Sequence, residues 1–82
     1  MDIRIINSEG NMFAIGDRTL RVNGRVLCLL DRNNQLETIE VYEGEEIARG
    51  IRDYIIKEIE ENFKNGKKDM IIETVSMRRK VV

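Results

Sequence analysis

The chain has 82 residues, which suffices for one domain with a modest core, because a chain of this size buries only about 60 to 65% of its unfolded surface. Its 14 Lys and Arg residues against 15 Asp and Glu residues exclude a general electrostatic attraction to nucleic acid or to a membrane. One cysteine cannot form an internal disulfide, and neither a membrane-length apolar run nor a signal-peptide pattern occurs. We therefore expect a cytoplasmic protein without a membrane partner.

Three short segments in which apolar and polar residues alternate predict the first strands of a sheet. Clusters of turn-forming residues separate these segments at positions 8–11 and 16–18. The predicted strands cover residues 2–7, residues 12–15 and a segment that begins at 19–22.

The dipeptide Asn23-Gly24 predicts a β-hairpin, because a type I′ turn needs positive φ at both central residues and Asn-Gly accepts it. This turn would pair Leu20 with Leu27, and directly paired residues share a face of the sheet.

A second turn is predicted at Asn33-Asn34. As a two-residue loop it would pair Leu29 with Thr38 and Val26 with Val41. A longer loop is the alternative, and it would change this register.

The predicted pairings give the sheet two faces of different composition. The face that we expect under a helix carries Val26, Cys28, Leu30, Ile39 and Val41. The opposite face would stay exposed over a few hundred Å², a size typical of an interface, unless the first strands or the C-terminal segment cover it. The predicted interface residues are Leu20, Val22, Leu27, Leu29 and Leu36, together with Ile56 of the helix.

Residues 45–64 have the pattern of one long amphipathic helix. Gly44 is the predicted N-cap, and Gly66 can adopt the left-handed conformation that ends a helix. The apolar arc is wider than one contact requires, so we expect a second contact, within a deep core or with another subunit. The apolar positions are Ile47, Ala48, Ile51, Tyr54, Ile55, Ile56, Ile59 and Phe63.

A last strand is predicted within residues 69–76, beside or across from the first, and residues 77–82 form a basic tail. The predicted fold is α+β with the order βββββαβ: an antiparallel sheet of four to six strands and one long helix on one face. Residues 1–76 would make a single domain.

The chemistry of the chain does not favour an enzyme. Histidine is absent, which removes the commonest general base and metal ligand, and no phosphate-binding glycine motif occurs. Cys28 lies in the apolar centre of a predicted strand, where a small core residue is a simpler interpretation than a nucleophile. We predict no catalytic residue, no metal site and no cofactor.

Arginines near the predicted turns are the candidate ligand-binding groups, because each can offer a forked pair of donors to a phosphate or carboxylate. The alternative is that they are charges that protect sheet edges from aggregation. The candidate set is Arg18, Arg21, Arg25 and Arg32, with Tyr42 as an aromatic that could stack on a base.

Two motifs resemble short reading frames of Firmicutes phages and mobile elements: Ile5-Ile6-Asn7-x-x-Gly10, and Tyr42-Glu43-Gly44-Glu45-Glu46-Ile47-Ala48 before an isoleucine-rich helix. Some small phage proteins of this build counter host defence, by plugging a defence protein or, as Thoeris anti-defence sponges do, by trapping its nucleotide signal. The resemblance implies a phage context, and hence the host cytoplasm.

We therefore predict a non-catalytic binding protein, a homo-oligomer that occupies a host protein or sequesters a small anionic nucleotide. The alternative is a nucleic-acid-binding regulator that uses the arginine hairpin and the basic residues Arg78-Arg79-Lys80.

Overall fold

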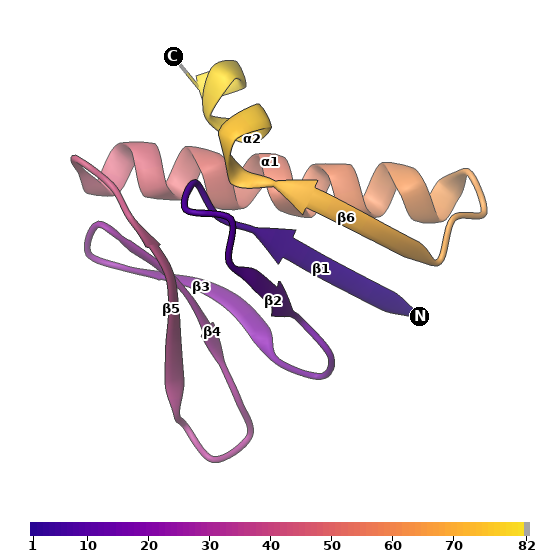
Figure 1. The fold of residues 1–82 in the computed structure, drawn as a ribbon, viewed down its shortest axis with the longest axis horizontal. Helices are drawn as coiled ribbons and strands as arrows, with labels where there is room; N and C mark the ends of the chain where they lie inside the picture. The colour runs from indigo at the N-terminus through magenta and orange to yellow at the C-terminus, as the bar shows by residue number, and fades with distance from the viewer. Residues whose placement is uncertain (82) are drawn as a thin grey trace.

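A computed structural model describes residues 1–81 (Figure 1). The fold is α+β, as predicted, but the strands form two sheets of three rather than one sheet, and a second helix follows the last strand. The elements in chain order are β1 (Asp2–Ile6), β2 (Met12–Ala14), β3 (Thr19–Asn23), β4 (Val26–Leu30), β5 (Leu36–Val41), α1 (Glu45–Lys64), β6 (Asp69–Glu73) and α2 (Thr74–Val81).

The first sheet has the strand order β2-β1-β6. β1 pairs antiparallel with β2 but parallel with β6, so the prediction of a wholly antiparallel sheet is wrong. The parallel register joins Ile3 to Met70 and Ile5 to Ile72. Ile3, Ile5 and Ile72 are buried, whereas Arg4 on the opposite face is exposed, as the period of two residues along a strand requires.

A tight turn between β2 and β3 separates the two sheets. Gly16 has φ of +58°, and the amide of Arg18 donates to the carbonyl of Ile15 at 3.0 Å. This turn sends β3 away from β1, so β3 pairs with β4 instead of extending the first sheet. Ile15 itself is buried between the two sheets' side chains in the common core.

The predicted β3–β4 hairpin is present, with its turn one residue later than expected. Gly24 has φ of +62° and Arg25 does not have positive φ, which is characteristic of a type II′ turn rather than type I′. Leu20 therefore pairs with Leu29 instead of Leu27. Because a shift of two positions keeps the same side chains together, the face composition of this hairpin is as predicted.

The β4–β5 connection is one residue longer than the predicted two-residue loop. Asn34 has φ of +62°, and the amide of Asp31 donates to the carbonyl of Gln35 at 3.0 Å. Leu36 therefore pairs with Leu30. The register returns to the predicted one at Val41, after a β-bulge that leaves Ile39 unpaired.

The sheet β3-β4-β5 turns its leucine face toward α1, the opposite of the prediction. Leu27 and Leu29 are fully buried in the same cluster as Ile51 and Ile55 of α1. The bulge also turns Ile39 into this core, where it is 2% exposed. The predicted interface is thus mainly a core surface, since the long leucine side chains fill the space beneath the helix.

Helix α1 has the predicted bounds and termini. Gly44 is its N-cap, and Glu45 and Glu46 occupy the first turn, where carboxylates favour the positive end of the helix dipole. Gly66 has φ of +81°, and the amide of Lys67 donates to the carbonyl of Asn62 at 2.9 Å, which satisfies a terminal carbonyl.

Neither helix within residues 1–81 is long and apolar enough to cross a membrane.

Helix α2 supplies the second contact of α1. Strand β6 ends at Glu73 rather than Ser76, and residues 74–81, expected as strand end and tail, form the helix; Val82 lies outside the described residues. Met77 is 5% exposed, and a Cβ atom on Gly50 would lie 3.0 Å from a methyl carbon of Val81. The glycine allows α2 to approach closely, and this burial stabilises a helix of weak intrinsic propensity.

We expect Ile55→Ala to lower the free energy of unfolding by about 2 to 5 kcal/mol, because truncation leaves a cavity in a fully buried site. The control Ile56→Ala, at a position that is 39% exposed, should cost less than about 1 kcal/mol. Urea denaturation of both variants measures the difference, and equal losses would contradict the assignment of the buried helix face.

Candidate binding face

The face of β3-β4-β5 that points away from α1 has no element packed over it among residues 1–81. We call it the outer face. Leu36 and Val41 are each 53% exposed on it, and Val26 and Leu30 are half-buried. By the strand register, its members are Thr19, Arg21, Asn23, Val26, Cys28, Leu30, Leu36, Thr38 and Val41.

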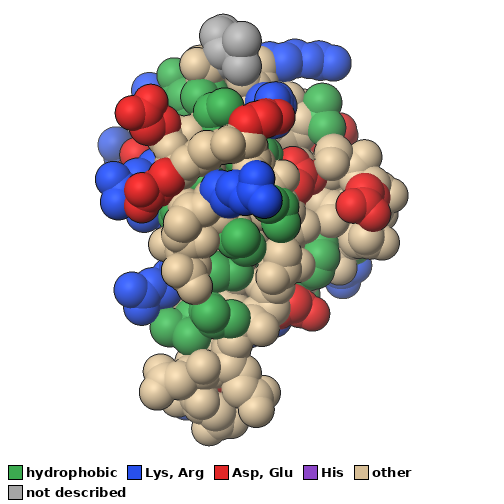
Figure 2. Space-filling model, turned by 90° about the vertical axis from the view of Figure 1, so that its left-hand side faces the viewer, with side chains coloured by type: hydrophobic (Ala, Val, Ile, Leu, Met, Phe, Trp, Pro, Cys, Tyr) green, Lys and Arg blue, Asp and Glu red, His purple; other side chains and the backbone are tan. Residues whose placement is uncertain are grey.

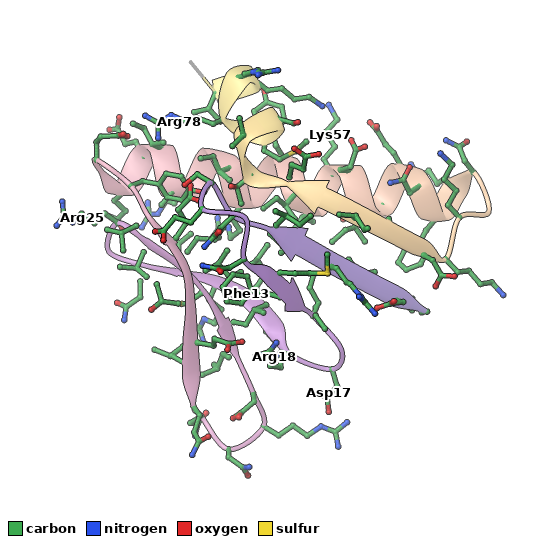
Figure 3. All side chains as sticks on the ribbon, viewed as in Figure 1. Phe13, Asp17, Arg18, Arg25, Lys57 and Arg78 are labelled. Carbon is green, nitrogen blue, oxygen red and sulfur yellow. The ribbon has the colours of Figure 1, made fainter. Side chains whose placement is uncertain are left out.

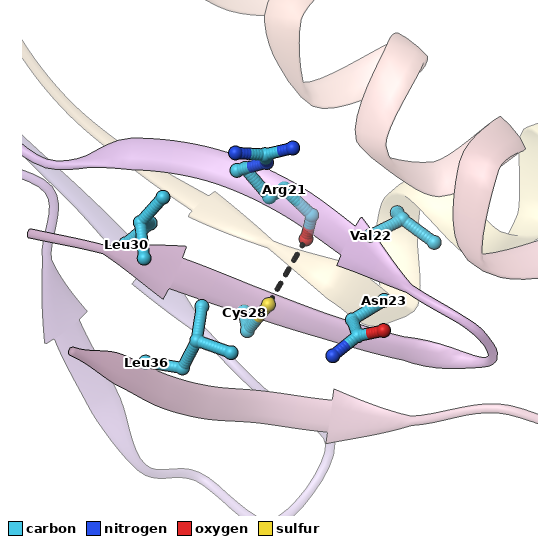
Figure 4. A pocket seen from close by; sticks show the side chains of 6 residues that line it. All are labelled: Arg21, Val22, Asn23, Cys28, Leu30 and Leu36. Atoms are coloured by element: carbon cyan, nitrogen blue, oxygen red, sulfur yellow. Dashed lines mark hydrogen bonds between the residues drawn. The ribbon is translucent and has the colours of Figure 1, made fainter. Parts of the chain in front are cut away.

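A hollow of about 300 Å³ lies in the outer face, at the lower end of the range for small-ligand pockets (Figure 4). Cys28, on the central strand, lies between Arg21 on β3 and Leu36 on β5, and its thiol contacts the carbonyl oxygen of Arg21 at 3.5 Å. The residues that line the hollow are Arg21, Val22, Asn23, Cys28, Leu30 and Leu36.

Cys28 is not poised for nucleophilic chemistry. Its side chain is 1% exposed, and burial raises the pKa of the thiol, an effect only partly opposed by the positive charge of Arg21. A protonated, shielded thiol acts as a small apolar residue.

The four candidate arginines fall into two pairs. Arg18 binds Glu37 at 2.6 Å and also donates to the carbonyl of Ala14, and Arg32 lies 3.1 Å from Asp17. Arg21 and Arg25, by contrast, form no ion pair with any residue from 1 to 81. Both belong to the β3–β4 hairpin: Arg21 lies on the outer face and lines the hollow, and Arg25 lies in the turn at the hairpin tip, next to Val26 of that face.

Tyr42 lies in the core and is 3% exposed, so its ring is not available to stack on a ligand. The guanidinium of Arg78 covers the ring at 6.0 Å from its centroid. The hydroxyl of Tyr42 has no hydrogen-bond partner within residues 1–81. Burial, together with the nearby Glu40, raises the pKa of this phenol. The aromatic contact predicted for a base is therefore absent from this surface.

The predicted interface residues divide into buried and exposed ones. Leu27 and Leu29 are fully buried, and Leu20 and Val22 pack against the core, whereas Leu36 and Ile56 are exposed. Only Leu36 belongs to the outer face. Val41 was not among the predicted interface residues because its face was expected to lie under the helix, and Thr38 reaches the outer face through the longer turn.

Figure 2, which views the left-hand side of Figure 1, shows hydrophobic side chains gathered in the middle of the molecule with a basic side chain across them. Acidic side chains lie around them, at the upper left and along the right of this view. Figure 3 shows Arg25 and Arg18 at opposite ends of the β3–β4 hairpin, which keeps the free arginine Arg25 away from the Arg18–Glu37 pair.

An ion pair between α2 and the loop that precedes α1 anchors α2. Arg78 donates to Glu43 at 2.5 Å, and this hydrogen bond lowers the pKa of the Glu43 carboxyl below its ordinary value. No group of three or more His, Cys, Asp or Glu side chains within residues 1–81 is placed to hold a metal ion.

No family model, curated protein or solved structure matches this chain. The geometry of the outer face is therefore the basis for a functional proposal.

We expect the Cys28 thiol to react with a disulfide reagent at pH 8 more than about tenfold slower in the folded protein than in urea, because it is shielded and its pKa is raised. Absorbance of the released thiolate measures both rates. Fast reaction in the folded state would show that the floor of the hollow is open to solvent.

We expect the attachment of α2 to weaken in acid. Folding lowers the pKa of the Glu43 carboxyl. The pair with Arg78 therefore stabilises the folded state fully at pH values above the ordinary pKa of a glutamate. This stabilisation is lost as the pH falls through the lowered pKa of Glu43. The protection factors of the α2 amides, which correct for the slower intrinsic exchange in acid, should therefore fall over that acidic interval. Glu43→Gln should remove the pH dependence, whereas the neighbouring Glu46→Gln should keep it.

Proposed function

We propose that this protein is a non-catalytic binding protein that acts by covering part of another protein with the outer face of β3-β4-β5. The observation that carries the proposal is the half-exposure of Leu36 and Val41 on a sheet face over which nothing packs within residues 1–81. Apolar side chains on one continuous sheet surface are typical of interaction sites.

The composition of the face supports binding rather than catalysis. Its one thiol is buried and protonated, and the chain contains no histidine to serve as a base. Arg21 and Asn23 at the edge of the hollow offer hydrogen-bond donors that fix orientation, which is a recognition role.

The resemblance to phage and mobile-element proteins supports the proposal that this protein acts inside an infected host cell. In that context the partner is a host protein, and covering it in the host cytoplasm would counter a defence system.

A nucleotide or a nucleic acid has less support as the ligand. Arg21 and Arg25 favour an anion, but Tyr42 is buried and none of the nine outer-face residues is aromatic. Two of the three basic residues at positions 78–80 are also engaged, since Arg78 pairs with Glu43 and Lys80 lies 3.9 Å from Glu58.

We expect a photoreactive amino acid at Thr38 to cross-link one discrete partner protein in the cells that produce this chain. The same residue at Ile71, which is 60% exposed on the first sheet, is the matched control and should give no such product. Leu36→Asp with Val41→Asp should abolish the product, because two carboxylates would be buried unpaired in the interface.

The double variant should keep its melting temperature within a few degrees, since both changed side chains are half-exposed. An unchanged cross-link in a folded Leu36→Asp, Val41→Asp variant, or equal products at Thr38 and Ile71, would contradict the proposed face.

A further inference from the structure

The outer face contains no acidic residue. The acidic residues of β5, Glu37 and Glu40, pair by register with Leu29 and Leu27 on the opposite side of the sheet. Both are also engaged: Glu37 binds Arg18, and Glu40 accepts from the amide of Ser8 at 2.5 Å. In a chain whose net charge is −1, this surface carries only positive charge.

The two free arginines can supply that charge to a ligand. Arg21 is exposed at the rim of the hollow, and Arg25 lies at the tip of the same hairpin. Neither has a carboxylate partner within residues 1–81, so each guanidinium can bind a carboxylate through two parallel hydrogen bonds without breaking an existing pair.

The size of the face favours a segment over a second copy of the chain. Three strands at about 4.8 Å spacing and about five residues at 3.3 Å cover roughly 14 by 17 Å, or about 240 Å². A stable protein dimer buries about 800 Å² per partner. A two-fold contact between copies would also bring two positive, acid-free faces together, which is electrostatically unfavourable.

The chemistry of the face favours a peptide over a nucleotide. The apolar area is not confined to the hollow, because Val41 lies outside its lining and is as exposed as Leu36. An extended segment with alternating apolar and charged side chains can cover both residues, whereas a base would find no aromatic ring.

We propose that the outer face binds an acidic, amphipathic segment of the partner protein. Its apolar side chains cover Leu36 and Val41, and its carboxylates pair with Arg21 and Arg25. This inference rests on the proposed function and specifies the partner that the same face takes.

The test uses the purified full chain and three synthetic decapeptides in which leucines are interspersed with Glu, Gln or Lys. Titrations followed by amide chemical shifts should show the Glu peptide binding at least about tenfold more tightly than the Gln peptide, the factor expected from charge-assisted hydrogen bonds. The shifts should map to β5 and to the β3–β4 hairpin.

Variants that remove or reverse the charges of Arg21 and Arg25 test whether these charges cause the preference. Arg21→Gln with Arg25→Gln should remove the preference for Glu over Gln, and Arg21→Glu with Arg25→Glu should transfer it to the Lys peptide. The control Arg32→Gln with Arg49→Gln makes the same change in net charge at exposed arginines outside this face and should preserve the preference. Melting curves establish that each variant is folded.

Several results would overturn the inference. They are equal affinity for the Glu and Gln peptides, a preference that survives loss of both arginines, displacement of the peptide by ADP, or shifts centred on Ile71. A dimer in light scattering that Leu36→Asp dissociates would show that a second copy occupies the face.

The cellular cross-link separates this inference from the proposed function. If the Thr38 product persists in the Arg21→Gln, Arg25→Gln variant, the face binds a protein but not through acidic groups, and only the present inference fails. If the wild-type protein gives no product at Thr38 and binds none of the peptides, both fail.

Discussion

The burial of one stripe of α1 is the constraint on which the rest of the structure depends. Ala48, Ile51 and Ile55 are fully buried, and one sheet of this size covers only one side of such a helix. Both sheets contribute side chains to the common core, and α2 closes the remaining side at Gly50. Because the inner faces of both sheets are used for this burial, the outer face of β3-β4-β5 is left to solvent or to a partner.

The sequence allowed the helix and the strands to be located because their signals are local. The apolar period from Ile47 onward and the terminal glycines Gly44 and Gly66 depend on neighbouring residues alone. Register is different, because one extra loop residue moves every side chain of the following segment to the other face. The longer loop that contains Asn34 made this change, the bulge at Ile39 reversed it before Val41, and neither has an unambiguous sequence signal.

The candidate site was predictable only in part for the same reason. Arg21 and Arg25 were among the predicted ligand-binding residues, and they are the two that no carboxylate in residues 1–81 engages. The carboxylate partners of Arg18 and Arg32 are Glu37 and Asp17, which are distant in sequence. These ion pairs could therefore be recognised only in the folded structure. Likewise, α2 could not be read from the segment starting at Thr74, because tertiary packing rather than propensity maintains that helix.

The parallel pairing of β1 with β6 sets an order for the assembly of the domain. Ile3 and Met70 are neighbours in the sheet although most of the chain lies between them, so closing this pair carries a large loop entropy. The hairpins of β3-β4-β5 close over a few residues and can form early. On a ribosome, β1 leaves the exit tunnel before β6 and has to wait for β6 to emerge before the first sheet is complete.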